Sequence, residues 1–222
     1  MSTLTFDRIS TDPAFQELFL TGHRRQLMKN QVVIEEGDSP TTLYLLMSGS
    51  VSVQLQNWHG RDALLAYMHA GHFFGEMGLF APDARRCARV ECVTDCLLLE
   101  IGYARFLELT RKHVSLWLEL ASQLATRLRA ANRRLAEMPV LDPSDRIWSV
   151  LTELAEHSTR HCSEGIELRI TRENLGKLAG CSRELAGSVL KTLCNEGRVL
   201  LRGQQIIVRS QQLMHSASRA AG

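Results

Sequence analysis

The stretch Gly75-Glu76-Met77-Gly78-Leu79-Phe80, followed by Arg85-Arg86-Cys87-Ala88, decides how the first half of this 222-residue chain is interpreted. Two glycines flank a carboxylate, and glycine allows a tight turn whose N–H groups come close to an anion. A short helical turn that begins near Glu76 would aim its positive end at a phosphate. Arg86 suits a charge-assisted contact to the same phosphate, and Glu76 suits a ribose hydroxyl. The alternative is an ordinary turn between strands with a surface arginine.

Short apolar segments divided by turn residues surround this stretch between His23 and Gly102. We expect strands at Thr42–Met47, Val51–Leu55, Ala63–Met68, Arg86–Val93 and Cys96–Ile101, with a turn at 36–40 and a hairpin tip at Trp58-His59-Gly60. Strands at this spacing predict an antiparallel barrel or sandwich. A short helix from Asp12 to Leu20 precedes them, because Asp12 suits a cap and Pro13 suits the first helical position.

A helical period begins after Gly102, first at Tyr103–Arg111 and then from Val114. Apolar residues then alternate at spacings of three and four, at Val114, Trp117, Ala121, Leu124, Leu128, Ala131, Leu135 and Met138. A sustained 3.5-residue period is typical of a coiled coil, so we expect a parallel homodimer through residues 114–138. The alternative is a long helix that crosses one face of its own domain. Pro139 ends the helix.

The last third of the chain predicts two helices joined by a tight turn and followed by a hairpin. A helix starts at Asp142-Pro143-Ser144-Asp145, a polar loop covers 158–165, and a short strand covers Ile166–Ile170. Thr171 can cap one helix and Ser182 a second, with Gly180 permitting the turn between them. Val199–Leu201 and Gln205–Val208 around Gly203 form a hairpin. This order predicts a winged helix-turn-helix.

The second of these helices carries residues that suit contacts to DNA bases. Arg183, Glu184 and Ser188 project away from its apolar positions, and arginine can bind guanine while glutamate accepts from cytosine. Residues 172–209 contain three acidic residues against seven basic ones, namely Arg172, Lys177, Arg183, Lys191, Arg198, Arg202 and Arg209. This excess permits a nucleic-acid interface. An ordinary helical hairpin is the alternative.

Composition fits a globular protein, with 45% hydrophobic and 23% charged residues and a net charge of +2. We expect no signal peptide and no membrane helix. The six cysteines form no compact disulfide framework, which predicts free thiols in a reducing cytoplasm. The gaps between Cys87, Cys92 and Cys96 match no zinc pattern, so we expect no metal. No nucleophile–base pair stands out, and we expect no enzyme.

Four motifs together resemble the CRP/FNR family of transcription regulators, and the cyclic AMP receptor protein branch in particular. They are Thr42-Leu43-Tyr44 through Gly49-Ser50-Val51, the segment 75–80, Ile170-Thr171-Arg172 and Gly180-Cys181-Ser182-Arg183-Glu184. The resemblance implies an α+β chain. It consists of an N-terminal antiparallel β-roll of the cyclic-nucleotide-binding jelly-roll type (1–112), a coiled-coil dimerisation helix (113–138) and a C-terminal winged helix-turn-helix (139–222). In this family, ligand binding to the β-roll reorients the second domain toward DNA.

The resemblance also implies roles for individual residues. The cyclic-nucleotide site would comprise Gly75, Glu76, Met77, Gly78, Arg86, Cys87 and Asn132, with Glu76 on the ribose and Arg86 on the cyclic phosphate. The DNA site would comprise Thr171, Arg172, Ser182, Arg183, Glu184, Ser188 and Lys191. Within it, Thr171, Arg172 and Ser182 would hold the DNA backbone, while Arg183 and Glu184 read bases.

Three departures from the family pattern involve four residues. Cys87 replaces the usual serine or threonine, Ala131 and Asn132 replace a hydroxyl pair, and Ser188 replaces a third base-reading arginine. We therefore expect a regulator whose effector is cyclic AMP as a first hypothesis. The alternatives are cyclic di-GMP, another effector or none, or a thiol redox-sensing regulator. The expected partners are double-stranded DNA, a second copy of the chain and RNA polymerase.

Overall fold

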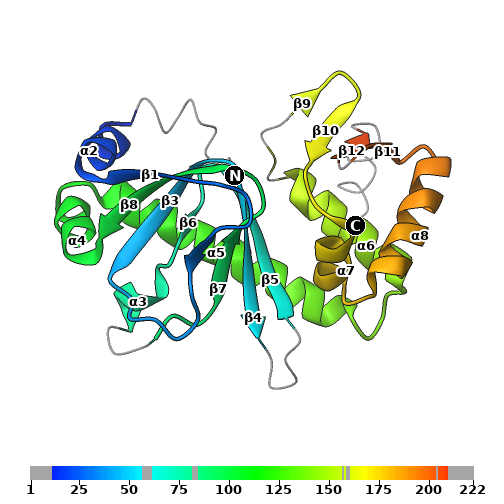
Figure 1. Cartoon of the computed structure of the whole chain (residues 1–222), viewed down its shortest axis with the longest axis horizontal. Helices are drawn as coiled ribbons and strands as arrows, with labels where there is room; N and C mark the ends of the chain where they lie inside the picture. The colour runs from blue at the N-terminus through cyan, green and yellow to red at the C-terminus, as the bar shows by residue number, and fades with distance from the viewer. Residues whose placement is uncertain are drawn as a thin grey trace. The chain divides into compact units, whose positions relative to one another are not determined.

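The computed structural model describes residues 12–56, 62–81, 85–156, 158, 161–203 and 205–209. The chain divides into two compact units, residues 1–129 and 130–222, and each is described by itself (Figure 1). The boundary falls inside one long helix, α5 (Val114–Glu137). The hairpin tip expected at Trp58-His59-Gly60 lies outside the described residues.

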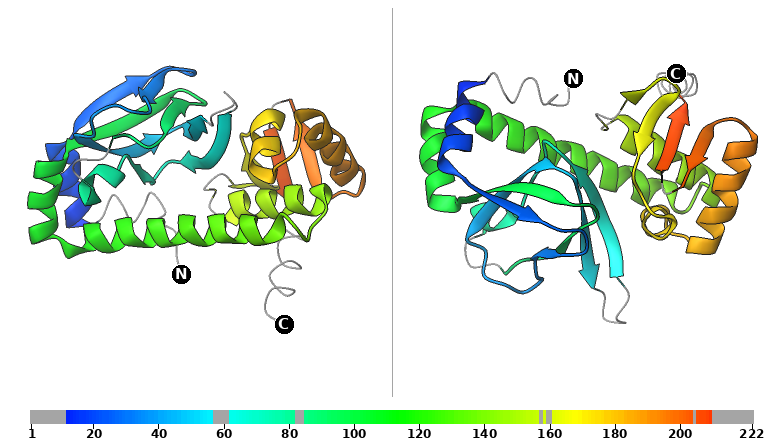
Figure 2. Two further views of the ribbon diagram at one scale, coloured as in Figure 1. Left: turned by 90° about the horizontal axis from the view of Figure 1, so that it is seen from below. Right: turned by 45° about the horizontal axis from the view of Figure 1, so that its top comes forward.

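The first unit contains two four-stranded antiparallel sheets, ordered β1-β8-β3-β6 and β2-β7-β4-β5 (Figure 2). Their strands are β1 (His23–Leu27), β2 (Val32–Ile34), β3 (Thr42–Ser48), β4 (Ser50–Gln56), β5 (Asp62–His69), β6 (Phe73–Phe74), β7 (Arg89–Cys92) and β8 (Cys96–Gly102). The predicted antiparallel roll is confirmed. The strand expected from Arg86 begins three residues later, at Arg89, which leaves Arg86 on the loop before it.

Alternating strand residues fill two apolar clusters in this unit. Phe15, Phe73 and Phe106 lie in the cluster that also includes the helices, whereas Leu46 and Val90 lie in the cluster formed by the strands. Period-2 alternation sends successive side chains of one strand into different clusters, as Phe73 and Phe74 show. Phe73 and Phe74, one in each cluster, therefore anchor the chain immediately before the segment 75–80.

Among the described residues of this unit, four helices accompany the sheets, namely α2 (Pro13–Thr21), α3 (Met77–Phe80), α4 (Tyr103–Lys112) and α5. The expected cap of α2 is confirmed, because the Asp12 side chain accepts from the Ala14 N–H at 2.8 Å. The predicted helical turn after Glu76 is also confirmed as α3. Helix α5 faces its own unit with buried Leu116 and Leu120.

The exposed face of α5 keeps only half of the expected coiled-coil seam, namely Val114, Ala121, Leu128 and Leu135. Trp117 and Leu124 are partly buried against the first unit's core and are not on the exposed face. The exposed face instead follows the set Val114, Leu118, Ala121, Ala125, Leu128, Asn132 and Leu135, which we call the exposed stripe. Its spacing still alternates between four and three. Leu118 and Leu135 are each 67% exposed, so a large apolar surface is uncovered.

The second unit contains α6 (Pro143–Glu156), α7 (Arg172–Ala179) and α8 (Arg183–Asn195) on a sheet ordered β11-β12-β10-β9. Its strands are β9 (His161–Cys162), β10 (Gly165–Leu168), β11 (Val199–Arg202) and β12 (Gln205–Arg209). The helix-turn-helix with its hairpin is confirmed. The prediction of a loop over 158–165 is wrong in part, because β9 pairs Cys162 with Gly165. The strand predicted at Ile166–Ile170 ends at Leu168.

A polar cluster joins the last turns of α5 to α6 within this unit. Glu153, 8% exposed, accepts from Arg133 Nη2 at 2.8 Å and from Arg134 Nη2 at 2.6 Å. Ser149 donates its hydroxyl to Glu137 at 2.8 Å. A buried carboxylate is tolerated when its charge is paired and hydrogen-bonded, as it is here. These contacts hold the end of α5 to α6 of the helix-turn-helix unit.

Candidate functional site

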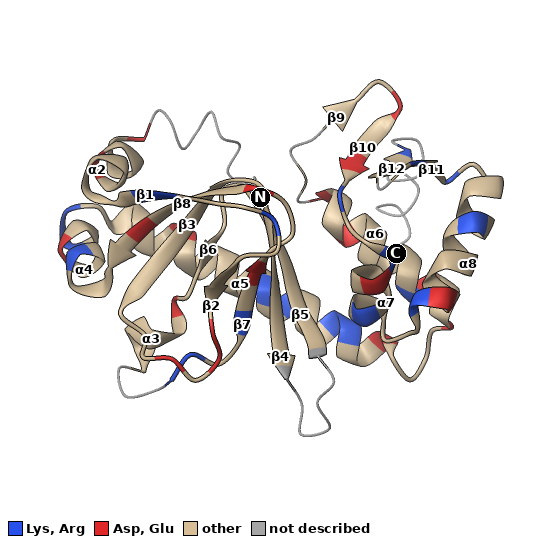
Figure 3. Ribbon diagram, in the orientation of Figure 1, with Lys and Arg blue, Asp and Glu red and all other residues tan. Residues whose placement is uncertain are grey.

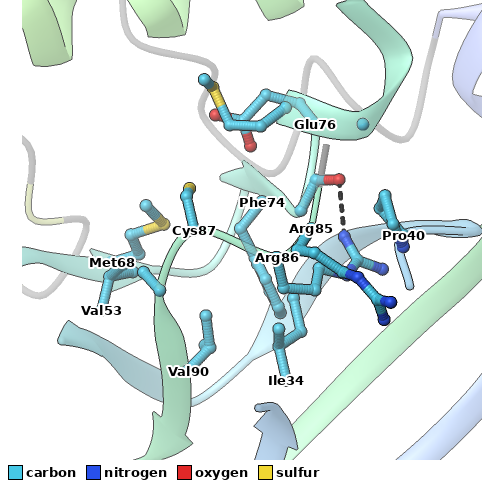
Figure 4. A pocket seen from close by; sticks show the side chains of 14 residues that line it. Ile34, Pro40, Val53, Met68, Phe74, Glu76, Arg85, Arg86, Cys87 and Val90 are labelled. Atoms are coloured by element: carbon cyan, nitrogen blue, oxygen red, sulfur yellow. Dashed lines mark hydrogen bonds between the residues drawn. The ribbon is translucent and has the colours of Figure 1, made fainter. Parts of the chain in front are cut away.

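A pocket of about 80 Å³ opens where the segment 75–78 meets residues 85–88 (Figure 4). Its lining is Ile34, Pro40, Val53, Met68, Phe74, Gly75, Glu76, Met77, Gly78, Arg85, Arg86, Cys87, Ala88 and Val90. Most of the wall is apolar, and the polar groups come from Glu76 and residues 85–87. An apolar pocket with a few convergent polar groups is the usual form of a small-molecule site.

Both glycines of the segment are required by close approach. Gly75 has φ +77°, and a Cβ there would lie 2.8 Å from Arg86 Nη1. A Cβ on Gly78 would lie 2.5 Å from Pro40 Cβ and 2.7 Å from the Tyr103 hydroxyl. Any other residue would push the segment off its neighbours. The glycines therefore hold the segment against Arg86 and Tyr103.

Arg86 is buried, at 8% exposed, and is fixed by three protein acceptors. Its Nη1 donates to Gly75 O at 2.9 Å and to the Tyr103 hydroxyl at 3.0 Å, and its Nη2 donates to Thr42 O at 2.8 Å. The guanidinium carbon also lies 5.8 Å from the ring centroid of Tyr44. Among the described residues, no partner takes its Nε–H or the second Nη2 hydrogen. Arg86 therefore keeps donors for an anion.

Glu76 is buried as well, at 7% exposed, and is tied to α5. Its Oε1 accepts from Arg127 Nη1 at 3.2 Å, and Arg127 also donates to Phe73 O. Burial lowers the pKa of the Arg127 guanidinium, and Glu76 opposes that shift. Oε2 of Glu76 has no partner in the parts of the chain that the structure describes. It is free to accept a hydroxyl.

The structure brings together six of the seven residues expected in the nucleotide site. Gly75, Glu76, Met77, Gly78, Arg86 and Cys87 all line the pocket. Asn132 is not among the lining residues. It lies exposed on α5 in the second unit, where its predicted role stays a prediction.

Two residues of the site were missed from the sequence, Tyr103 and Arg127. Tyr103 begins α4 and donates to Gly75 O at 2.5 Å while accepting from Arg86. Arg127 follows Leu116 and Leu120 along the inward face of α5, a spacing that was available in the sequence. No sequence signal marks Tyr103, because its partners are distant in the chain.

The cysteines expected to be free are free, and they are not alike. Cys87 is exposed at the pocket, while Cys92 and Cys96 are buried in the strand core. The hydrogen bond to Cys96 and burial both raise the pKa of the Cys92 thiol, which disfavours its reactive thiolate. Within the described ranges, no group of three or more His, Cys, Asp or Glu residues is placed to hold a metal ion.

The helix-turn-helix is held by the caps that the sequence predicts. The Thr171 side chain accepts from Asn174 N at 3.1 Å and the Ser182 side chain accepts from Leu185 N at 3.2 Å. Gly180 adopts the left-handed conformation, with φ +64° and ψ +41°. The backbone N–H of Gly180 and that of Cys181 then donate to the carbonyls of Gly176 and Lys177 in the last turn of α7. The turn therefore fixes where α8 begins.

The ribbon of helix α8 is coloured for basic and acidic residues at its start and for a basic residue further along (Figure 3). Ala186, Val189, Leu190 and Leu193 are buried against the unit's core. The predicted DNA residues on this helix, Arg183, Glu184, Ser188 and Lys191, are all exposed. Their side chains have no hydrogen-bond or ion-pair partner among the described residues. They are available to an outside partner.

These features define a class of protein in which one chain combines a β-roll of the cyclic-nucleotide-binding type with a winged helix-turn-helix. The family model of the cyclic nucleotide-binding domain matches residues 24–113, and that of the Crp-like helix-turn-helix domain matches residues 145–215. The chain belongs to the CRP/FNR family of transcription regulators. No helix of the described segments has the length and apolar character needed to cross a membrane.

Individual relatives agree over most of their length. The cAMP-activated global transcriptional regulator Vfr of Pseudomonas aeruginosa is 34% identical over 84% of this chain and 89% of its own. The cAMP-activated regulator CRP of Salmonella typhimurium is 32% identical over 89% of this chain and 95% of its own. A solved structure of the c-di-GMP responsive regulator CLP of Xanthomonas campestris has 34% identity and a TM-score of 0.71, covering 90% of this chain and all of that one. These relatives are regulators of transcription and not enzymes.

Proposed function

We propose that this protein is a homodimeric, sequence-specific DNA-binding transcription regulator controlled by a cyclic nucleotide in the β-roll, with cyclic AMP as the first candidate. The observation that carries the proposal is the pairing of Arg86 and Glu76 at one pocket. Arg86 offers two N–H donors for a cyclic phosphate, and Glu76 offers Oε2 for a ribose hydroxyl. The apolar wall formed by Val53, Met68 and Val90 suits a nucleobase.

The DNA half of the proposal rests on α8 and its surroundings. Arg183 and Glu184 would read base edges in the major groove, and Ser188 would lie one turn further along. Thr171, Arg172, Ser182 and Lys191 would contact phosphates, which fixes the position of the helix. All seven side chains are exposed. RNA polymerase is the further partner that we propose for this role.

The dimer half of the proposal rests on the exposed stripe of α5. Pairing two stripes would cover Val114, Leu118, Leu128 and Leu135, each more than 60% exposed. Asn132 would then lie at the seam, where a polar side chain fixes register or bonds the base of the partner's nucleotide. Leu128→Glu should give a monomer in analytical ultracentrifugation. Leu20→Glu, at an 89% exposed leucine of α2, is the control that should stay dimeric.

Control by the effector follows from the contacts of α5. Gln123 and Arg127 on this helix bond to Gly71, Phe73 and Glu76 around the pocket. A nucleotide that changes the partners of Glu76 changes the partners of Arg127, and it acts if it binds the DNA-competent state more tightly. The same helix continues to Glu137 and its neighbours in the second unit. Residues 1–112, 113–138 and 139–222 are thus sensor, dimer helix and DNA-binding domain.

Calorimetric titration with cyclic AMP, cyclic GMP and cyclic di-GMP tests the sensor, followed by fluorescence anisotropy on a randomised duplex pool for DNA. We expect one nucleotide to bind with micromolar or tighter affinity and to change sequence-selective DNA binding. Arg183→Ala should keep the nucleotide and lose the selected sequence. The proposal is wrong if no selective DNA binding appears with or without any nucleotide.

Cyclic di-GMP, or another effector with two phosphates, is the second candidate, and two observations favour it. Arg85 places a second guanidinium on the pocket lining beside Arg86, and both side chains extend toward Pro40 in Figure 4. Cys87 supplies only a weak donor where a hydroxyl would hold a single cyclic phosphate. Arg85→Ala separates the candidates, because it should weaken cyclic di-GMP by about tenfold and cyclic AMP little.

A further inference from the structure

Tyr103 occupies the contact between the glycine segment and the arginine of the pocket. Its hydroxyl donates to Gly75 O at 2.5 Å and accepts from Arg86 Nη1 at 3.0 Å, so donor and acceptor functions are both used. Its ring centroid lies 5.9 Å from the guanidinium carbon of Arg86. Burial raises the pKa of the Tyr103 phenol, which keeps the hydroxyl protonated and able to donate.

We propose that Tyr103 is the positioning residue of the anion site, holding Arg86 so that its Nε–H and second Nη2 hydrogen face the phosphate group of the effector. This inference rests on the proposed nucleotide pocket. The three bonds from Arg86 to Gly75 O, Tyr103 and Thr42 O close one edge of the guanidinium. Only the other edge is left for a ligand. A planar fork binds phosphate well only if its orientation is fixed in advance.

The placement of Tyr103 in the chain supports a specific role and not mere packing. It is the first residue of α4, and its ring packs against the edge of the core that contains Phe106 while its hydroxyl reaches Gly75 and Arg86. A Cβ on Gly78 would meet Tyr103 Oη at 2.7 Å and Cε2 at 2.8 Å, as well as Pro40 Cβ at 2.5 Å. Gly75, Gly78 and Arg86 therefore all converge on this one phenol.

Tyr44 provides a matched control for the hydroxyl. Its ring centroid lies 5.8 Å from the Arg86 guanidinium carbon, nearly the same distance as that of Tyr103. Its hydroxyl, unlike that of Tyr103, makes no hydrogen bond to Arg86 or Gly75 in the described parts of the chain. Tyr44→Phe and Tyr103→Phe thus remove the same group, and only the second removes the positioning bond.

The experiment titrates cyclic AMP and cyclic di-GMP into the full-length wild type, Tyr103→Phe, Tyr44→Phe, Arg86→Lys and the Tyr103→Phe/Arg86→Lys double variant. For the nucleotide that the wild type binds, Tyr103→Phe should bind about tenfold more weakly and Tyr44→Phe within about twofold. In the Arg86→Lys background, Tyr103→Phe should change the nucleotide affinity little, because the guanidinium that Tyr103 positions is absent. DNA binding by Tyr103→Phe at saturating nucleotide should reach the wild-type level.

Each other result overturns a definite statement. Wild-type or tighter nucleotide binding by Tyr103→Phe, with unchanged melting by circular dichroism, overturns the positioning role while the pocket stands. An equal loss in the presence and absence of Arg86 overturns it too, since Tyr103 would then act through packing. If the wild type binds neither nucleotide, the proposed pocket fails first and the positioning role with it.

Discussion

The pocket of the first unit and the exposed face of α8 in the second differ in how their charged side chains are bonded. Arg86 and Glu76 are buried and already bonded to the protein, through Gly75, Thr42, Tyr103 and Arg127. Arg183, Glu184 and Lys191 are exposed and have no partner among the described residues. A ligand in the proposed pocket would therefore join an existing network, whereas DNA at the proposed interface would meet side chains that have no partner among the described residues.

This difference teaches which kind of change each region tolerates. A buried charged group is separated from water and depends on its hydrogen-bond partners. Removing it leaves those partners buried and unsatisfied, so folding is affected as well as binding. An exposed unpartnered charge contributes little to stability, so removing it affects binding alone. Substitutions in the two regions should thus separate by their effect on unfolding.

The largest effect is expected for Arg86→Ala. It removes the anion's donors and leaves Gly75 O and Thr42 O without their partner, so nucleotide affinity should fall by at least about 100-fold and the free energy of unfolding by about 1–3 kcal/mol. Calorimetry and urea unfolding measure both. Arg111→Ala, at an exposed arginine of α4, is the control for charge alone. Loss of nucleotide affinity without loss of stability would show that the hydrogen bonds of Arg86 to Gly75, Thr42 and Tyr103 do not contribute to the free energy of unfolding.

The next effect extends the comparison to the buried charge of the second unit, with Glu153→Ala. Arg133 and Arg134 both lose their carboxylate, and the free energy of unfolding should fall by about 2–3 kcal/mol. This is less than for a fully buried ion pair, because the Arg133 side chain is 40% exposed. Glu156→Ala, exposed on the same helix, should change it by less than about 0.5 kcal/mol. Equal values for the two variants in urea unfolding would contradict the role given to the cluster.

A smaller effect, confined to DNA, is expected for Arg183→Ala. Losing a bidentate contact to guanine costs about 1–3 kcal/mol, so affinity for the selected sequence should fall about tenfold while binding to random DNA changes less. The unfolding midpoint in urea should stay that of the wild type. A fall in stability comparable to that of Glu153→Ala would show that Arg183 has protein partners after all.

The smallest effect is expected for Lys191→Ala. A lost phosphate contact weakens all sequences alike by a few-fold, and the slope of log affinity against log salt should become less negative by about 1. Anisotropy titrations at several salt concentrations give this slope. If the loss is instead specific to one sequence, Lys191 contacts a base and belongs with Arg183.

The sequence was enough for the fold wherever local chemistry fixes the backbone. Asp12, Thr171 and Ser182 are caps whose side chains bond the next turn, and Gly180 is a turn that needs a left-handed residue. Short pairings were not predictable in this way. The strand β9 is two residues long and depends on pairing with β10, and the register of α5 depends on which residues the core covers.

In the candidate site, too, the residues that are close in sequence were predictable and the distant ones were not. The segment 75–78 and Arg86 are near each other in sequence and carry a recognisable spacing, so they were found. Tyr103 and Arg127 reach the pocket from α4 and α5, and their contacts span 28 and 51 residues of chain. Whether a tyrosine hydroxyl meets a carbonyl so distant depends on the packing of the whole roll. Such partners become visible only in three dimensions.

Helix α5 divides its surface by face, and this has a consequence for how such regulators change over generations. The inward face carries Leu120 into the core, Gln123 to Gly71 and Arg127 to Glu76 of the pocket, while the outward face carries Leu118, Leu128 and Leu135. Because these two sets share no residue, substitutions at Gln123 and Arg127 would retune the proposed pocket without altering the leucines of the exposed stripe, whereas a change at Asn132 would affect both. A lineage would therefore exchange its signal most readily through the inward positions.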